Sequence, residues 1–382
     1  YTITAALPYA NGPVHIGHLA GVYLPADIYV RYLRAMGKDV AFIGGSDEHG
    51  VAITLKAKKE GKTPQQIVDH YHELIKKSFV SFGISFDIYS RTSSLKHHET
   101  ASEYFHELHK KGVFEEIESQ QFYDEKADQF LADRYIKGTC PTCSYVEAYG
   151  DQCEYCGSTL SPSELINPKS MLSGDVPIMK ATKHWYFPLN KYENFLREYI
   201  LRDHREWKSN VSGQCKSWLD GGLRARPMTR DLDWGIKVPI KGAMGKVLYV
   251  WFDALLGYVS AISQDMNNPS LEESINNGWP ADLHLIGKDI LRFHAVYWPA
   301  MLISAGMKIP KMVFGHGFLT REGQKMGKSL GNVLDPNILL SKYGKEAVRW
   351  YLLKDISLGS DGDFQNKRFV DIINNDLANT IG

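Results

Sequence analysis

Apolar and polar residues recur with two different periods along the first part of the chain. Over residues 1–7, Ile3 and Ala5 alternate with threonines, and this period of two predicts a β-strand. The apolar run at 39–44 is typical of a parallel strand buried on both faces. Helical periodicity and helix-start signals predict helices over 16–37, 51–61, 63–81 and 95–111. Such alternation of strands and helices indicates a doubly wound α/β sheet.

A different texture separates this alternation from a second one. Between 113 and 225 charged loops predominate, with strands expected at 114–123, 129–136 and 182–189 and helices at 192–200 and 214–219. The α/β pattern then returns, with strands expected at 246–251, 283–287 and 312–314 and a helix at 290–305. Short helices are expected at 336–342, 345–354 and 366–380. We therefore expect a sheet that begins, is interrupted by an insert and resumes.

Composition is that of an ordinary globular protein with more than one domain. The chain has 382 residues, of which 43% are hydrophobic and 23% charged. Lys+Arg and Asp+Glu both number 44, so net charge does not argue for a nucleic-acid partner, although a local basic patch would not show in the sum. Without a bilayer-length apolar run or a recognisable leader, we expect a cytoplasmic protein. Because it begins at Tyr1 and ends inside a helical pattern at 369–381, we expect a piece of a longer chain.

Four of the five cysteines form two C-x-x-C pairs. They are Cys140 with Cys143 and Cys153 with Cys156. Two such pairs are the layout of a tetrahedral Cys₄ zinc knuckle, and no open coordination position is implied, so we predict one structural Zn²⁺. Disulfides or uncoordinated thiols are the alternatives. The clustered set and the separate Cys215 suit a reducing compartment.

A turn rich in proline and glycine at 8–13 separates the first predicted strand from the first helix. His15 and His18 follow it, and we expect both on one face of the first helical turn. A helix N-terminus presents unpaired N–H groups that suit a phosphate, and two imidazoles would add donors. Gly17 permits a ligand to approach closely. The alternative is a capped helix with two surface histidines.

Two aspartates follow predicted strands. Asp47 comes after the strand at 39–44, and Asp289 after the strand at 283–287. Ligands of open α/β sheets bind beyond the carboxyl ends of strands, so Asp47 could bind a substrate amine and Asp289 a ribose hydroxyl. Each could equally cap the helix that follows it.

Two further sets of residues have both a structural and a functional interpretation. An aromatic set lies on two strand–helix corners and, taken alone, favours a core, although it could also enclose a small apolar side chain: Trp251, Tyr258, Phe293, His294 and Trp298. Lys325 and Lys328 lie in a polar loop, where they could neutralise a triphosphate as pyrophosphate leaves. A solvated loop is the ordinary explanation of such a pair.

Taken together, these motifs resemble those of the class I aminoacyl-tRNA synthetases. His15-Ile-Gly-His18 is similar to their HIGH signature and Lys325-Met-Gly-Lys-Ser329 to their KMSKS signature, in the same order and with an insert between them. Four features resemble the methionyl-tRNA synthetases in particular: residues 6–12, the cysteine pairs, Val250-Trp-Phe-Asp-Ala254 and Ile286-Gly-Lys-Asp-Ile290. The resemblance covers essentially the whole chain.

The resemblance implies a division into domains. A Rossmann-type catalytic domain, with a doubly wound parallel sheet, would occupy 1–112 and 226–320. A connective-peptide insert would split it at 113–225, with the zinc knuckle at about 138–160. The KMSKS loop and a small helical stem-contact region would follow at 321–365, and a truncated helical anticodon-binding domain would begin at 366–382.

The resemblance also implies roles for single residues. The catalytic groups would be His15, His18, Lys325 and Lys328. ATP would be bound by His15, Gly17, His18, Gly287, Asp289, Leu319 and Lys328. Methionine would contact Ala6, Leu7, Tyr9, Asp47, Trp251, Ala254, Leu255, Tyr258, Ile290, Phe293, His294 and Trp298, with Asp47 on its ammonium. The metal ligands would be Cys140, Cys143, Cys153 and Cys156.

Two positions depart from the pattern of the family, and a third lies in a further stretch that resembles it. Gly327 replaces the first serine of KMSKS, which should loosen the loop and removes a hydroxyl. Leu255 stands where many members of the family have proline, which would reshape one wall of the pocket. Arg230 lies in a stretch that resembles a structural and gating region of the family.

The implied reaction has two steps: methionine and Mg-ATP give methionyl-adenylate, and the methionyl group then passes to the terminal adenosine of tRNA(Met). Catalysis would be positioning and electrostatics without a protein nucleophile. Homocysteine should be activated too, because an apolar pocket discriminates one methyl group only weakly. The alternatives are a synthetase for leucine, isoleucine or valine, a small nucleotidylyltransferase, and a non-catalytic tRNA-binding module. The first usually carries a larger insert, the second needs no knuckle, and the retained histidines, aspartates and lysines argue against the third.

Overall fold

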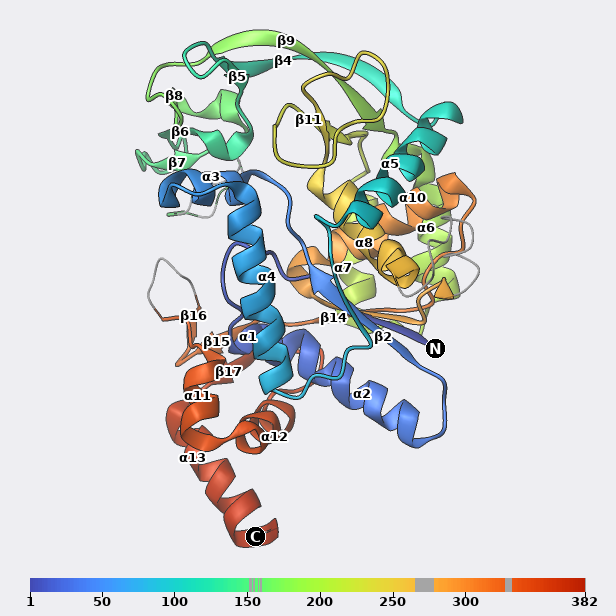
Figure 1. The fold of residues 1–382 in the computed structure, drawn as a ribbon, viewed down its shortest axis with the longest axis vertical. Coiled ribbons are helices and arrows are strands. Elements are labelled where there is room, and N and C mark those ends of the chain that lie inside the picture. The colour runs from blue at the N-terminus through green and yellow to red at the C-terminus, as the bar shows by residue number, and fades with distance from the viewer. Residues whose placement is uncertain are drawn as a thin grey trace.

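The computed structural model describes residues 1–150, 153, 155–156, 158, 160–264, 278–326 and 332–381. A five-stranded parallel sheet lies at its centre, in the order β14-β13-β1-β2-β3, with helices packed around it (Figure 1). The strands are β1 (Thr2–Ala5), β2 (Ala41–Ser46), β3 (Ile88–Arg91), β13 (Leu283–Gly287) and β14 (Val313–His316). The predicted doubly wound sheet is confirmed, and β1 pairs with β2 on one side and with β13 on the other.

The helices of the first half begin and end where the sequence signals predict. They are α3 (Val51–Glu60), α4 (Pro64–Ser81) and α5 (Leu95–Lys110). Thr63 caps α4, because its side-chain oxygen accepts from Gln66 N–H and the Gln66 side-chain oxygen accepts from Thr63 N–H. Gly61 ends α3 with a φ of 63°, a conformation that glycine adopts without strain.

Two π-helical stretches lie next to the central sheet, and each leads into an α-helix that has proline in its first turn. Leu19–Tyr23 connects α1 (Ile16–His18) to α2 (Leu24–Ala35), and Phe293–Tyr297 precedes α10 (Trp298–Ala305). Pro25 and Pro299 have no N–H to donate to the carbonyl four residues earlier. The hydrogen bonds before each proline therefore join residues five apart, as in a π-helix, instead of four apart.

The insert contains two antiparallel sheets. A long antiparallel pair of strands, β4 (Glu115–Asp124) and β9 (Ile178–Phe187), runs across the top of the molecule in Figure 1. It forms one sheet with β5 (Gln129–Phe130) and β10 (Arg226–Pro227), and β6 (Ile136–Thr139), β7 (Ala148–Tyr149) and β8 (Ile166–Ser170) form the other. The remaining helices are η2 (Asp133–Tyr135), η3 (Pro162–Glu164), η4 (Leu189–Tyr192), α6 (Glu193–Arg197), η5 (Glu198–Asp203) and α7 (Ser209–Asp220).

Two predicted strands are wrong in extent. Instead of one strand over 129–136, β5 ends at Phe130 and a 3₁₀ turn precedes β6, because Tyr135 N–H bonds to Ala132 O within the turn and β6 then pairs with β7 and β8 instead of β4. Instead of a strand over 246–251, only β12 (Val247–Leu248) forms, pairing with β11 (Thr229–Arg230), and helix α8 (Val250–Gln264) starts at once. Residues 252–263 are buried without interruption, as in a helix that is enclosed on every side, so packing overrides the local β-propensity.

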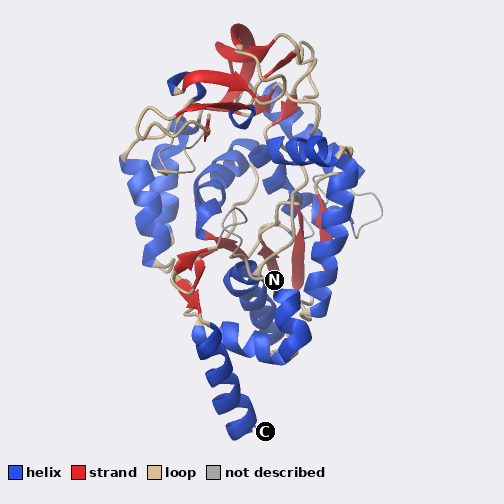
Figure 2. Ribbon diagram, turned by 90° about the vertical axis from the view of Figure 1, so that its left-hand side faces the viewer, coloured by secondary structure: helices blue, strands red, loops and turns tan. Residues whose placement is uncertain are grey.

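The C-terminal part holds a small sheet that the sequence did not suggest. It consists of β15 (Leu319–Arg321), β16 (Gln324–Lys325) and β17 (Gly362–Phe364). Three helices accompany it, α11 (Pro336–Tyr343), α12 (Lys345–Asp355) and α13 (Asn366–Ile372), and the last continues as a π-helix to Ile381 and extends from the body (Figure 2). Asp27 of α2 is fully buried and pairs with Arg349 of α12 at 2.6 Å, which joins this part to the central sheet. Among the described helices, none has the length and apolar character needed to cross a membrane.

Candidate active site

A cleft of about 990 Å³ lies beyond the carboxyl ends of the central strands. Much of the predicted site lines it: Ala6, Leu7, Tyr9, His15, Gly17, His18, Asp47, Trp251, Gly287, Asp289, Ile290 and Leu319. They come from segments far apart in the sequence. These segments meet because the parallel strands of one sheet end at the same edge. The candidates for phosphate, amine and ribose binding therefore face one space.

The two histidines form a reciprocal cap at the start of α1. His15 lies just outside the helix as its N-cap rather than inside the first turn, and its Nδ1 accepts from Gly17 N–H at 3.1 Å. His15 N–H donates to His18 Nδ1 at 3.0 Å, and the two ring centroids are 3.9 Å apart. Since each Nδ1 accepts a backbone N–H, each neutral ring carries its proton on Nε2. Two imidazole donors are thus set side by side at a helix N-terminus.

Gly17 is required by this arrangement. A Cβ at position 17 would lie 2.9 Å from His15 Cε1 and 3.3 Å from the Met326 methyl. Any side chain there would displace the His15 ring or the segment that holds Met326.

Asp47 is buried at the rim of the sheet. Its backbone is bonded to the turn after β1, since Asp47 N–H donates to Pro8 O and Ala10 N–H donates to Asp47 O. The N-cap of α3 is Gly50, so the alternative that Asp47 caps this helix is wrong. Burial, and then the nearby Asp253, raise the pKa of Asp47 well above its usual value. A cation entering the cleft would stabilise the charged form of this carboxylate.

Asp289 also does not cap a helix. It lies inside the short 3₁₀ helix Lys288–Ile290, whose N-cap is Gly287. Its Oδ1 would lie 2.5 Å from a Cβ at Gly287, so glycine is needed for the carboxylate to fold back over the end of β13. This places an acceptor at the strand end, beside the histidine pair.

The aromatic set divides into a wall and a layer behind it. Trp251 lines the cleft and stacks on Phe293 with centroids 3.9 Å apart and ring planes at 6°. Behind them, Tyr258 O–H donates to His294 Nε2 at 2.8 Å, and His294 Nδ1–H donates to Ile290 O at 3.0 Å. Burial lowers the pKa of His294 to about 4, so the ring is neutral and can make both bonds.

Several predicted pocket residues do not line the cleft. Phe293 reaches it only through Trp251, and the others are buried in the layer behind: Ala254, Leu255, Tyr258, His294 and Trp298. Leu7 connects the two layers, because its Cδ1 would lie 2.8 Å from a Cβ at Gly257 of α8.

The segment that carries the lysine motif is described only in part. Met326 lines the cleft, and the backbone of Lys325 belongs to β16. Gly327 and Lys328, together with the side chain of Lys325, lie outside the described residues.

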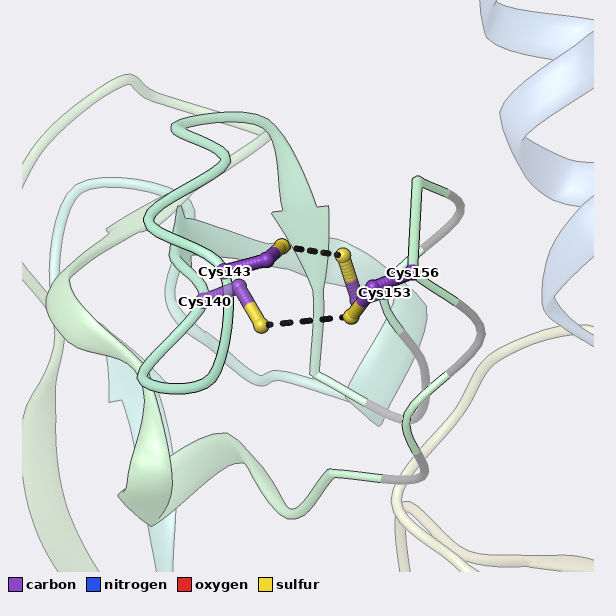
Figure 3. A group of neighbouring side chains, drawn as sticks. All are labelled: Cys140, Cys143, Cys153 and Cys156. Atoms are coloured by element: carbon purple, nitrogen blue, oxygen red, sulfur yellow. Dashed lines mark hydrogen bonds between the residues drawn. The ribbon is translucent and has the colours of Figure 1, made fainter.

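The four cysteines point their sulfur atoms toward one another (Figure 3). All four sulfurs lie within 4.8 Å of one another, with Cys143 Sγ 3.6 Å from Cys153 Sγ and Cys140 Sγ 3.9 Å from Cys156 Sγ. A tetrahedral zinc with bonds of about 2.3 Å requires sulfurs about 3.8 Å apart. Disulfide sulfurs would be much closer, at about 2 Å. The hydroxyl of Ser158 and its backbone lower the pKa of Cys156 to about 6, which favours the thiolate that a metal needs.

Sequence reasoning missed the wall that the insert contributes. Gln120 and Gln121 of β4 and Met179 of β9 line the cleft, as does Trp234. None of these residues belongs to a motif. The two glutamines and Met179 reach the cleft only because the pair β4–β9 folds over the central sheet. Arg230, singled out by resemblance, lies on the same wall, with its guanidinium 4.0 Å from the ring centroid of Tyr249.

Comparison with known proteins agrees with this arrangement. A family profile described as "tRNA synthetases class I (M)" matches residues 1–382. The methionine–tRNA ligase of Cytophaga hutchinsonii is 56% identical over 394 aligned residues, which cover 100% of this chain and 57% of that protein. That of Bacteroides fragilis is 56% identical over 388, covering 100% of this chain and 56% of the relative. The chain thus spans a little over half the length of these curated relatives.

A solved structure is similar over nearly the whole fold. Methionyl-tRNA synthetase of Mycobacterium tuberculosis, in complex with methionyl-adenylate, superposes with a TM-score of 0.79 at 30% identity. The similarity covers 99% of this chain and 69% of that one.

Proposed function

The chain belongs to the class I tRNA synthetases, in their M group, and from this premise we propose that it activates L-methionine with ATP and transfers it to the 3′-terminal adenosine of tRNA(Met), for protein synthesis and its initiation. One observation carries the proposal. A single cleft is lined by His15, His18, Asp47 and Asp289, so groups suited to phosphate, an amine and a ribose face the same space.

ATP is proposed to bind along the histidine side of the cleft. Asp289 and the backbone at Gly287 would hold the ribose, and the backbone at Leu319 the adenine. The Nε2–H groups of His15 and His18 would donate to the phosphates, which is supported by their position at a helix N-terminus. Lys325 and Lys328 are proposed, from the motif alone, to neutralise the departing pyrophosphate with the Mg²⁺ that accompanies ATP.

Methionine is proposed to bind between Asp47 and the aromatic wall. The Asp47 carboxylate would pair with the ammonium group, and the side chain would extend past Leu7 toward Tyr258 and His294. The remaining proposed contacts form the floor and walls: Ala6, Tyr9, Trp251, Ala254, Leu255, Ile290, Phe293 and Trp298. The stacked Trp251 lines the cleft at its entrance to this layer, so we propose that it closes on the bound side chain.

The first step is an in-line displacement at phosphorus. A methionine carboxylate oxygen attacks the α-phosphate, a P–O bond forms, and the bond to the β-phosphate breaks with release of pyrophosphate. Charge builds on the phosphate oxygens, where the histidine donors are already oriented, and one such preorganised donor contributes about 3–4 kcal/mol. In the second step the 2′-hydroxyl of the terminal adenosine attacks the methionyl carbonyl and AMP leaves. The contribution of the chain is positioning and electrostatics throughout.

A structural zinc is proposed at Cys140, Cys143, Cys153 and Cys156, since their spacing fits tetrahedral thiolate coordination. The metal would supply folding energy to the knuckle and take no part in the reaction. The knuckle shares a small core with Val51 and Leu55 of α3, so it would also hold that helix over the cleft. The proposed domains are a catalytic domain at 1–112 and 226–320, an insert at 113–225, the KMSKS loop and stem-contact region at 321–365, and the start of an anticodon-binding domain at 366–382. We propose that tRNA approaches from the insert and the stem-contact region.

Amino-acid-dependent ATP–pyrophosphate exchange tests the proposal. Methionine should give strong exchange, and leucine, isoleucine and valine little. A response to leucine without one to methionine would replace this proposal with an aliphatic synthetase, and no response to any amino acid would favour a binding module. His18→Ala should slow adenylate formation far more than it weakens methionine binding. His106→Ala removes an exposed histidine of α5 outside the cleft and serves as the control.

A further inference from the structure

A group of buried polar residues next to Asp47 has no part in the steps above. It consists of Asp253 of α8, His49, and the neighbours His97 and His98 of α5, and we refer to it as the Asp253 cluster. Asp253 and His97 are fully buried, and His49 is 2% exposed. Burying a carboxylate and a histidine pair costs free energy, so the cluster calls for a physical reason.

Asp253 is the centre of the cluster. Its Oδ2 lies 3.2 Å from His49 Nδ1, and the far side of that ring is met by His98, with the two Nε2 atoms 3.3 Å apart. Its Oδ1 lies 3.8 Å from His97 Nε2, and within the described part of the chain neither of these atoms has a hydrogen-bond partner. Asp253 therefore holds His49 firmly and keeps one oxygen unsatisfied.

The charge of the cluster resides on Asp253. Burial alone would raise its pKa, but His49 and His97 offset that effect, so the pKa is lowered. Burial lowers the pKa of His97, and it lowers that of His98 to about 4, so both rings are neutral at neutral pH. A buried carboxylate charge thus lies close to Asp47.

His49 connects this charge to Asp47. It belongs to the same short loop, and its N–H lies 3.5 Å from Asp47 Oδ1. Glu48, between them, is held on its other side: its Oε2 accepts from Arg91 Nε at 2.9 Å, and its carbonyl accepts from Trp234 Nε1 at 2.7 Å. The loop is therefore anchored by Glu48 on one side and by the His49–Asp253 contact on the other.

We propose that Asp253 is a positioning residue for amino-acid recognition, which fixes the Asp47 carboxylate through His49 and adds a second, buried negative charge that attracts the ammonium group of methionine. The inference rests on the proposed function, because it deepens the role given to Asp47. Asp253 itself does not line the cleft, so it acts through its neighbours and its field.

The arrangement predicts a distinctive pH dependence. Asp47 is faced by Asp253 and Tyr258 from α8, by Tyr9 from the turn after β1, and by Glu48 and His49 from its own loop. Asp253 is faced by His49, His97 and His98, and by Asp47 and Tyr9. Because Asp253 raises the pKa of Asp47, neutralising Asp253 should let Asp47 ionise at a lower pH. The acid limb of kcat/KM for methionine, which reports the free enzyme, should then move to lower pH.

Asp253→Asn in the 382-residue chain tests the inference by pyrophosphate exchange. We expect KM for methionine to rise tenfold or more, KM for ATP and kcat to stay within about twofold, and the acid limb to move to lower pH. Asp124→Asn is the matched control, because Asp124 is a 2% exposed carboxylate of the insert that does not line the cleft. A purely structural role for Asp253 would change kcat and both KM values together and would leave the acid limb in place.

A second pair of variants covers the case in which Asp253→Asn does not fold. His49→Asn keeps an N–H donor near the position of His49 Nδ1, whereas His49→Ala removes it. We therefore expect the alanine variant to lose methionine affinity and the asparagine variant to retain most of it. Unchanged methionine KM in Asp253→Asn, or equal KM in the two His49 variants, overturns the inference while exchange by the unaltered chain upholds the proposed function. Absence of methionine-dependent exchange in the unaltered chain would refute the proposed function itself.

Discussion

Gly17→Ala separates the chemistry of the site from the stability of the fold. The added Cβ would lie 2.9 Å from His15 Cε1 and 3.0 Å from His15 Nδ1, closer than such atoms pack. The backbone here is helical, so the methyl group causes no strain in itself. The His15 ring must therefore move, and the bond that its Nδ1 accepts from the backbone of residue 17 is lost with it.

The two effects on stability nearly cancel. Glycine to alanine within a helix stabilises by about 1 kcal/mol. Loss of the N-cap bond costs about 1 kcal/mol. The effect on chemistry has no such compensation, because displacing one preorganised donor costs about 3–4 kcal/mol of transition-state stabilisation, a factor of roughly 10²–10³ in rate.

Pyrophosphate exchange and thermal unfolding of the same preparation check this reasoning. We expect exchange to fall by roughly 10²–10³ in kcat while Tm changes by less than about 4 °C. Methionine affinity, measured separately by equilibrium binding, should remain near that of the unaltered chain. Exchange within threefold of the unaltered chain would show that the His15 ring position does not matter for the reaction.

Three further predictions concern other parts of the molecule. Because burial and Asp253 raise the pKa of Asp47 above its usual 3.8, KM for methionine should increase on acidification at pH values where an ordinary aspartate is still charged, as a pH series of kcat/KM would show. Cys156→Ser should lower the zinc content below one equivalent per chain and lower Tm, measured by metal analysis and calorimetry, whereas Cys215→Ser, in a buried position apart from the cluster, should leave the zinc in place. Asp27→Ala leaves Arg349 without its buried partner and should cost about 3–5 kcal/mol in denaturant unfolding, and a loss below 1 kcal/mol would contradict this role of the pair.

Local sequence signals were sufficient for the central sheet and its helices. Strand β13 lies where an apolar run ends in glycine, and α4 starts at a threonine followed by proline. The same local signals failed where tertiary contacts decide whether a segment forms a strand or a helix. Residues 250–251 have the β-propensity of a strand but belong to α8, a helix whose residues 252–263 are buried on every side, so packing decides the outcome.

The candidate site was predictable in its motifs and not in its surroundings. The strand ends located His15, Asp47 and Asp289, but which residues line the cleft and which lie behind it follows from packing across long stretches of sequence. The contact between His49 and Asp253 joins positions 204 residues apart, and although the motif at 250–254 contains Asp253, no local pattern predicts that the two residues meet. The sequence therefore predicted the polar groups that face the cleft, and it did not predict the contacts that fix those groups in position.

Strand β1 acquires its two neighbours at very different times during synthesis. Its pairing with β2 joins Ile3 to Phe42, but its pairing with β13 joins Ile3 to Leu283, which is 283 − 3 = 280 residues later. At about 5–20 residues per second, a ribosome needs roughly 14–56 s to cover that interval. During this time one edge of the central strand has no partner, and an open edge can pair with other chains. The connective insert, synthesised in between, must fold while the centre of the sheet is still incomplete, so the nascent chain needs protection from aggregation until β13 has been made.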